Sequence, residues 1–99
     1  MIRLTPFAEQ QLDELERHYV KLQRPHSLRR LIEAVDAALV GIERHPDNGL
    51  PAPRPYPQLA RPGRAWVKSG RYWVSYATAP QLLITGIFYE TANIPVRAK

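Results

Sequence analysis

The chain has 99 residues, of which 44% are hydrophobic and 23% are charged, and its formal net charge is +5. This length supports one hydrophobic core and excludes a second domain, and no apolar run approaches the roughly 20 residues of a membrane-spanning helix. The sequence has no cysteine, which excludes disulfides and thiolate metal sites. We therefore expect a single soluble, cytoplasmic domain over residues 1–99, without a cofactor.

The positive charge is confined to one half of the sequence. Residues 1–50 contain seven Lys and Arg against eight Asp and Glu, whereas residues 51–99 contain seven Lys and Arg against one acid, Glu90. A surface of one sign concentrates ligands of the opposite sign, so this half favours an anionic partner such as nucleic acid, an acidic peptide or phosphate. The simpler alternative is that the basic half only keeps the protein soluble.

Two amphipathic helices are predicted in the first half. Thr5-Pro6 suits the cap and first turn of a helix, and apolar residues then recur at spacings of three and four until Arg24-Pro25. Ser27 is the candidate cap of a second helix with the same periodicity, which His45-Pro46 ends. Because only a few residues connect the two helices, they should fold back as an antiparallel hairpin.

A proline-rich segment follows the predicted hairpin. Residues 45–63 contain six of the ten prolines, four of them at alternate positions. That spacing favours extended polyproline geometry over helix or strand. An irregular segment of this length is often functional in a compact domain, although prolines can also simply stiffen a connection.

The second half predicts three antiparallel strands, over residues 65–68, 72–77 and 82–89. The short piece at residues 2–4 is expected to pair with the last of them. That last strand has apolar residues at both odd and even positions, so both of its faces should be covered. The helices can cover one face, and the tail, the proline-rich segment or another polypeptide should cover the other. The expected fold is α+β, with an N-terminal helical hairpin packed on a small antiparallel sheet.

Strand parity assigns faces to the aromatic residues. Trp66 shares one face of its strand with Arg64 and Lys68, so we expect it to face a partner rather than the core. A tryptophan among basic side chains is also an arrangement that stacks on single-stranded nucleic acid. Tyr72 and Tyr76 share a face of the next strand and are expected in the core and at its rim.

Four short motifs occur along the chain: Leu-Thr-Pro followed by Ala-Glu within residues 4–9, Ile-Glu-Arg-His-Pro at 42–46, Gly-Arg-Tyr-Trp-Val-Ser-Tyr at 70–76 and Ile-Phe-Tyr-Glu at 87–90. Together with the order of the predicted elements, they resemble the ParE branch of the ParE/RelE superfamily of bacterial type II toxins. The resemblance implies a toxin of a plasmid or chromosomal stabilisation module, held silent by a cognate antitoxin that wraps around it. ParE-like members poison DNA gyrase, whereas RelE-like members cut messenger RNA in the ribosomal A site.

The residues distinguish these two activities. RelE-like nucleases typically place an arginine after the first tyrosine of the middle strand, where this chain has Trp73, and they carry a basic cluster near the last strand that is missing here. Metal-free RNA cleavage needs a base, an acid and positive charge at the phosphate, and Glu90 beside Tyr89 is the only obvious base in the basic half. We therefore expect a gyrase inhibitor without catalytic residues, with an endoribonuclease or a non-toxic binding module as alternatives.

The candidate contact residues for target and antitoxin lie in the basic half: Arg61, Arg64, Trp66, Lys68, Arg71, Tyr89 and Glu90. The three histidines lack the spacing of ligands on one helix face, so no metal site is expected. Arg29, Arg30 and Glu33 on the second helix are interpreted as a solvated face. The expected partners are the cognate antitoxin, in a hetero-oligomer, and DNA gyrase, with no membrane involved.

Overall fold

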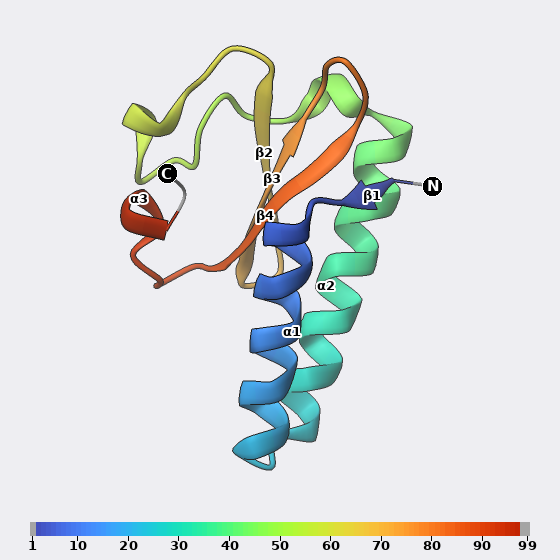
Figure 1. Ribbon diagram of the computed structural model, residues 1–99, viewed down its shortest axis with the longest axis vertical. Coiled ribbons are helices and arrows are strands. Elements are labelled where there is room, and N and C mark those ends of the chain that lie inside the picture. The colour runs from blue at the N-terminus through green and yellow to red at the C-terminus, as the bar shows by residue number, and fades with distance from the viewer. Residues whose placement is uncertain (1, 98–99) are drawn as a thin grey trace.

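The computed structural model describes residues 2–97, which form three α-helices and a four-stranded sheet. The elements are, in chain order, β1 (Arg3–Leu4), α1 (Pro6–Lys21), α2 (Pro25–Arg44), the 3₁₀ helices η1 (Pro46–Asn48) and η2 (Pro57–Leu59), β2 (Arg64–Ser69), β3 (Tyr72–Ala77), β4 (Leu83–Tyr89) and α3 (Ile94–Arg97). Figure 1 shows α1 and α2 side by side, with the far half of this hairpin extending beyond the strands. The α+β class, the helical hairpin and the three-stranded meander are confirmed.

The sheet is mixed, with the strand order β1-β4-β3-β2. Strands β2, β3 and β4 form the predicted antiparallel meander, while β1 pairs with β4 in parallel, with Leu4 opposite Ile84. The predicted pairing of the first strand with the last is confirmed, but the antiparallel sheet is wrong at this edge. A tight turn imposes antiparallel pairing, whereas most of the chain separates β1 from β4 and permits the parallel direction.

Helix α1 begins where its sequence signals predict. The Thr5 hydroxyl accepts a hydrogen bond from the Ala8 amide at 3.2 Å, Pro6 occupies the first turn, and Glu9 places a negative charge there. The Thr5 hydroxyl satisfies a backbone amide that has no partner within the helix, and Pro6 has no amide to satisfy. The charge of Glu9 complements the positive end of the helix dipole. The helix ends at Lys21, and Gln23 in the following turn has a φ of 55°.

Helix α2 begins two residues earlier than Ser27, the predicted cap, so that prediction is wrong. Pro25 occupies the first turn and Arg24 is the capping residue, with no side-chain hydrogen bond to the helix. Proline is pre-organised for a first helical turn, and this local preference determines the start. The helix ends at Arg44, before His45-Pro46, as predicted. None of the helices within residues 2–97 has the length and apolarity needed to cross a bilayer.

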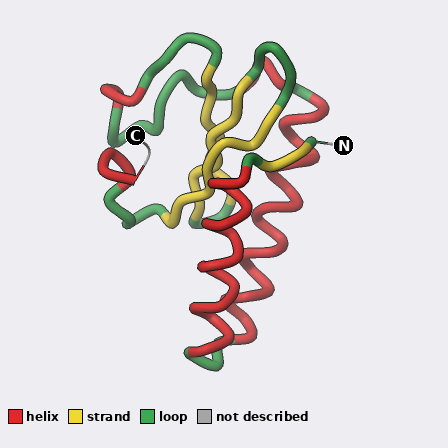
Figure 2. The backbone as a smooth tube through the Cα atoms, viewed as in Figure 1, coloured by secondary structure: helices red, strands yellow, loops and turns green. Residues whose placement is uncertain are grey.

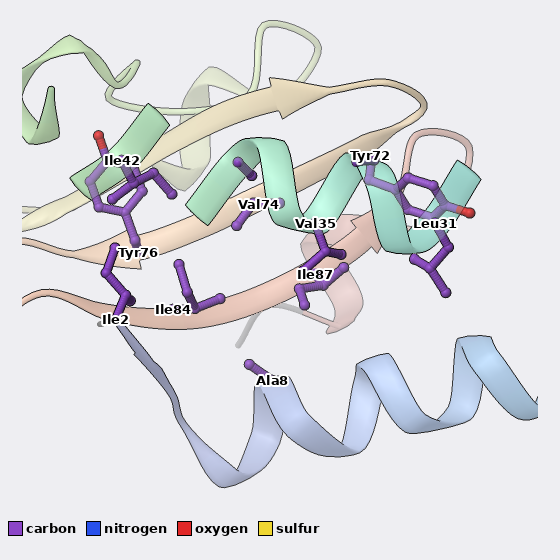
Figure 3. Packing of buried hydrophobic residues seen from close by; sticks show 12 residues of the cluster. Ile2, Ala8, Leu31, Val35, Ile42, Tyr72, Val74, Tyr76, Ile84 and Ile87 are labelled. Atoms are coloured by element: carbon purple, nitrogen blue, oxygen red, sulfur yellow. The ribbon is translucent and has the colours of Figure 1, made fainter. Parts of the chain in front are cut away.

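The main core lies between the helical hairpin and one face of the sheet. Helix α1 packs on β4, and α2 packs on β2 and β3. Figure 3 shows Tyr72 beside Leu31 at one end of this core and Tyr76 beside Ile42 at the other. All four residues are buried, which confirms the predicted core positions of the two tyrosines.

A second, smaller core covers the opposite face of the sheet. Its buried residues are Trp66, Trp73, Phe88 and Ile94, and the partly buried Leu50, Tyr56 and Leu59 pack against them. Figure 2 shows the segment between α2 and β2 together with α3 on the side of the sheet away from the hairpin. Both faces of β4 are therefore covered, and within residues 2–97 the cover of the second face comes from the proline-rich segment and from α3.

This second core corrects the prediction for Trp66. The side chain shares a face with Arg64 and Lys68, as the parity requires, but it is only 2% exposed. Its backbone is paired with Leu50, whose amide donates to the Trp66 carbonyl at 2.7 Å and whose carbonyl accepts from the Trp66 amide at 2.7 Å. The proline-rich segment therefore lies over the side chain that was expected to face a partner.

Candidate functional site

The predicted contact residues do not form one patch. Arg64 opens β2, whereas Lys68 lies near the end of that strand, opposite Trp73. At a rise of about 3.3 Å per residue, their Cα atoms are roughly 13 Å apart. Arg61 lies three residues before Arg64, at the start of β2. The basic residues are therefore divided between the two ends of this strand.

The second end brings four of the predicted residues together. Tyr72 pairs with Tyr89 across β3 and β4, and the Glu90 amide donates to the Arg71 carbonyl at 2.8 Å. The Lys68 ammonium lies 3.2 Å from a Glu90 carboxylate oxygen, with each side chain 32% exposed. Lys68 also lies 5.5 Å from the centre of the Trp73 ring. Glu90, the candidate base, is therefore engaged by an ammonium group.

Three tyrosines from different elements meet at this end. The hydroxyls of Tyr19 and Tyr72 are 2.6 Å apart, and the rings of Tyr72 and Tyr89 make an edge contact with centroids 5.6 Å apart. Burial, followed by the hydrogen bond to Tyr19, raises the pKa of Tyr72 above its usual value. Because one hydroxyl proton lies between the two oxygens, the proton of the other hydroxyl remains available to a ligand.

These tyrosines line a cleft of about 650 Å³ between the helical hairpin and the β2–β3 turn. Its polar lining includes Arg24, the capping residue of α2, Arg30 within α2 and Arg71 of the turn, with Glu33 as its carboxylate. We call this feature the arginine cleft. Its volume falls within the range of small-molecule sites, roughly 300–1,000 Å³.

The two walls of the arginine cleft are held together by a close contact. The Ser69 hydroxyl donates to the Ala34 carbonyl of α2 at 2.6 Å. Gly70 follows with a φ of 56°, and a Cβ atom at this position would lie 3.3 Å from the Ala34 Cβ. A side chain here would be strained and crowded. Glycine therefore lets the turn approach α2 and fixes Arg71 at the edge of the cleft.

Arg71 lies next to Tyr89 in this arrangement. The pKa of Arg71 is raised, mainly by its hydrogen bond to the Tyr89 side chain, and the negative charge of Glu90 raises it further. The guanidinium is exposed and carries its charge at every physiological pH. Arg71 is thus a permanent positive charge at the cleft entrance.

The sequence identifies two of the residues that line this cleft, Arg71 and Tyr89, and misses four, Arg24, Arg30, Tyr19 and Tyr72. Arg30 was interpreted as part of a solvated face, and Tyr72 as core, which it also is. A signal was present in the sequence: residues 24–30 contain three arginines and one histidine and no acid, at the start of a helix. Cations are unfavourable at this end of a helix.

A smaller cavity of about 310 Å³ lies between α1 and the end of β4. Its lining includes His18, Tyr89 and Arg97, and near it the Gln11 side chain accepts a hydrogen bond from the Ile87 amide at 2.9 Å. Within residues 2–97, no group of three or more His, Asp or Glu side chains is placed to hold a metal ion.

Comparison with protein-family models gives no match to this chain. Comparison with curated proteins also gives no significant match.

Proposed function

We propose that this chain is a toxin of the ParE/RelE type, neutralised by a cognate antitoxin, and that it acts by binding DNA gyrase. The observation that carries the proposal is the position of the four motifs. They coincide with the cap of α1, the end of α2, the β2–β3 turn with β3, and the end of β4. The segments that resemble the family are thus the segments that terminate and connect the elements.

The geometry favours binding over RNA cleavage. Glu90 is paired with Lys68 rather than free to take a proton from a ribose hydroxyl. Trp73, at the position where RelE-like nucleases typically have an arginine, is 3% exposed and packs in the second core. Neither residue supplies the base or the positive charge that cleavage through a 2′-hydroxyl requires. An inhibitor that acts by contact needs neither.

The contact surface that we propose is the end of the sheet that carries Lys68, Arg71, Tyr89 and Glu90. Charged side chains at an interface increase the association rate, and their effect decreases with salt because screening acts over about 8 Å at physiological ionic strength. Arg61 and Arg64 lie at the opposite end of β2 and provide a matched comparison with the same charge.

Gyrase supercoiling assays with purified protein test this proposal. We expect inhibition of supercoiling or stabilised cleavage complexes, and we expect Arg71→Glu to weaken the effect at least about tenfold, a change typical of a lost interfacial charge contact. Arg61→Glu, at the far end, should change it less than about threefold. The wild-type effect should also decrease as salt is raised.

Ribosome assays provide the opposing outcome. Site-specific cleavage of messenger RNA in the A site by the purified protein, lost in Glu90→Gln, would replace the gyrase proposal with the nuclease. Absence of both activities, with binding to an antitoxin retained, would identify the chain as a binding module without toxicity.

A further inference from the structure

The two helices of the hairpin begin in opposite electrostatic environments. Helix α1 starts with a threonine cap and Glu9 in its first turn, whereas α2 starts with Arg24, has no side-chain cap and has no acid in its first turn. The positive end of the α2 dipole therefore meets the positive charge of Arg24, an arrangement that costs stability in the free protein. An anion bound at this place would offset that cost.

The positive charges of the arginine cleft are not neutralised within the protein. The ion pairs within residues 2–97 are Arg17 with Asp13 and Lys68 with Glu90, so the three arginines of the cleft have no carboxylate within 4 Å. Glu33 lines the cleft without pairing with any of them. Arginine keeps its proton under all physiological conditions. Three positive charges and one negative charge therefore share a single cavity.

The tyrosines add neutral groups to this set of charges. The Tyr19 and Tyr72 pair has one hydroxyl proton available to donate, and Tyr89 presents a half-buried ring beside Arg71. A phenol donor suits an anionic oxygen, and a ring edge or face suits a planar group next to that anion. The cleft thus offers both a charged subsite and an aromatic wall.

We propose that the arginine cleft binds a phosphate monoester, such as the terminal phosphate of a nucleotide. Arginine recognises phosphate oxygens in two-point geometry. The monoester has a second pKa of about 6 and approaches two negative charges at neutral pH, which matches the excess of two positive charges in the cleft. The volume of about 650 Å³ exceeds the need of a phosphate alone and leaves room for the group that carries it.

This site shares Arg71 and Tyr89 with the proposed gyrase contact and differs from it in Arg24 and Arg30. Arg24 is the capping residue of α2 and Arg30 lies within that helix. Failure of one proposal therefore leaves the other open to its own test. Arg30 is the best probe because it lines the cleft and is not one of the proposed contact residues.

Calorimetric titration of the whole chain with AMP, inorganic phosphate, sulfate and adenosine tests the proposal. We expect AMP to bind and adenosine to bind at least about tenfold more weakly, since a charged hydrogen bond to phosphate is lost. Inorganic phosphate identifies the source: affinity equal to that of AMP points to free phosphate, and weaker affinity points to a nucleotide whose base contacts the tyrosines. No binding of AMP or phosphate at about 10 mM, the range of very weak complexes, overturns the proposal.

Two variants distinguish binding in the arginine cleft from nonspecific attraction of an anion to a basic protein. Arg30→Gln should weaken AMP binding at least about tenfold. Arg29→Gln removes the same charge from the adjacent position of α2, outside the cleft lining, and should change the affinity less than about twofold. Circular dichroism checks that both variants fold. Equal loss in the two variants would show diffuse attraction and would overturn the site.

The pH dependence identifies the phosphate monoester as the ligand. Lowering the pH from about 7.5 to about 5 converts AMP from a dianion towards a monoanion and should weaken its binding severalfold. The charged and titratable groups that line the cleft are Arg24, Arg30, Glu33 and Arg71 with the three tyrosines. The Lys68–Glu90 pair lies at the adjoining strand end, and the His18 ring packs against Tyr19 with centroids 5.6 Å apart, so any contribution of these groups to the pH dependence is common to AMP and sulfate. Sulfate keeps its charge over this range and is the matched probe. Equal pH dependence of AMP and sulfate would assign the change to the protein and contradict the monoester.

Discussion

The two faces of the sheet are covered in different ways. On one face, regular helices place a side chain every turn onto the strands, and twelve buried residues form a continuous cluster. On the other face, the proline-rich segment and the four-residue helix α3 cover a cluster of four buried residues. The helix face is therefore the main source of stability, because buried apolar area sets most of the folding free energy.

The faces also differ in how completely their polar groups are satisfied. On the helix face, the Tyr76 hydroxyl donates to the Pro46 carbonyl at 2.7 Å, and Tyr72 shares its hydrogen bond with Tyr19. On the loop face, the Trp66 indole N–H is buried and has no hydrogen-bond partner within residues 2–97. Prolines supply no backbone N–H, so the proline-rich segment has fewer groups with which to fix its position. We expect this cover to open locally before the protein unfolds.

The largest expected effect compares one buried isoleucine from each face. Ile87 is 1% exposed on the helix face and Ile94 is fully buried on the loop face. Ile87→Ala should lower the free energy of unfolding by about 2–5 kcal/mol, because the packed helices cannot collapse into the cavity. Ile94→Ala should cost less than about half of that, since the loop cover can rearrange. Urea unfolding measures both, and equal losses would contradict the difference between the faces.

The buried tyrosines of the helix face predict loss of stability at alkaline pH. Burial raises the pKa of both Tyr72 and Tyr76 above 10, the value for the unfolded chain. Below pH 10 the phenols are neutral in both states, so their stabilisation is complete. Above it the unfolded chain releases protons first, and the free energy of unfolding should fall by up to about 1.4 kcal/mol per pH unit for each tyrosine.

The measurement for this prediction is urea unfolding at pH values from about 8 to about 11. Tyr72→Phe should reduce the alkaline slope, because it removes one of the two shifted groups. An unchanged slope in this variant would show that Tyr72 does not titrate differently in the folded protein.

The hydrogen bond of Tyr76 joins the two covers of the sheet. Its ring belongs to the helix-face core and its hydroxyl reaches Pro46, at the start of the proline-rich segment. Tyr76→Phe should lower the free energy of unfolding by about 0.5–1.5 kcal/mol, the net value of one such bond. It should also increase amide exchange at Leu50, as NMR can measure. Tyr56→Phe in the loop cover serves as the control and should leave both quantities nearly unchanged.

The smallest expected effect concerns Trp66 on the loop face, whose buried indole N–H has no hydrogen-bond partner within residues 2–97. Trp66→Phe removes a buried N–H without a partner, whose burial costs roughly 1–3 kcal/mol, and this gain offsets the lost packing area. The melting temperature should stay close to that of the wild type. Trp73→Phe replaces the indole that Arg54 and Lys68 approach at 5.8 and 5.5 Å with a smaller ring that attracts cations less, and it should destabilise the protein more. The reverse order of melting temperatures would contradict the unsatisfied indole.

Much of the fold was predictable because its signals act over a few residues. Thr5 caps α1, His45-Pro46 ends α2, and Gly70 adopts the positive φ of the β2–β3 turn, each as its residue type favours. The start of α2 was placed too late because a serine and a proline compete as start signals two residues apart. Local chemistry therefore determined the order and approximate bounds of the elements.

The candidate site was predicted only in part, because it is assembled from segments far apart in the sequence. Arg71 and Tyr89 were identified from the basic half, but Arg24 and Arg30 come from the first half, whose charges nearly balance. Arg24 was interpreted as the end of the first helix, and Arg30 as part of a solvated face. Periodicity does not state which part of the sheet that face meets.

The amino-acid sequence by itself determined the α+β class, the helical hairpin, the meander and the need for a second cover on β4, because periodicity, caps and turn residues are local properties. The tertiary structure alone decided the parallel direction of β1, the burial of Trp66 and the meeting of Arg24, Arg30 and Arg71. Each of these depends on how distant segments pack against one another. Parity specifies which side chains share a face, but packing between distant segments decides whether that face meets solvent, a loop or a ligand.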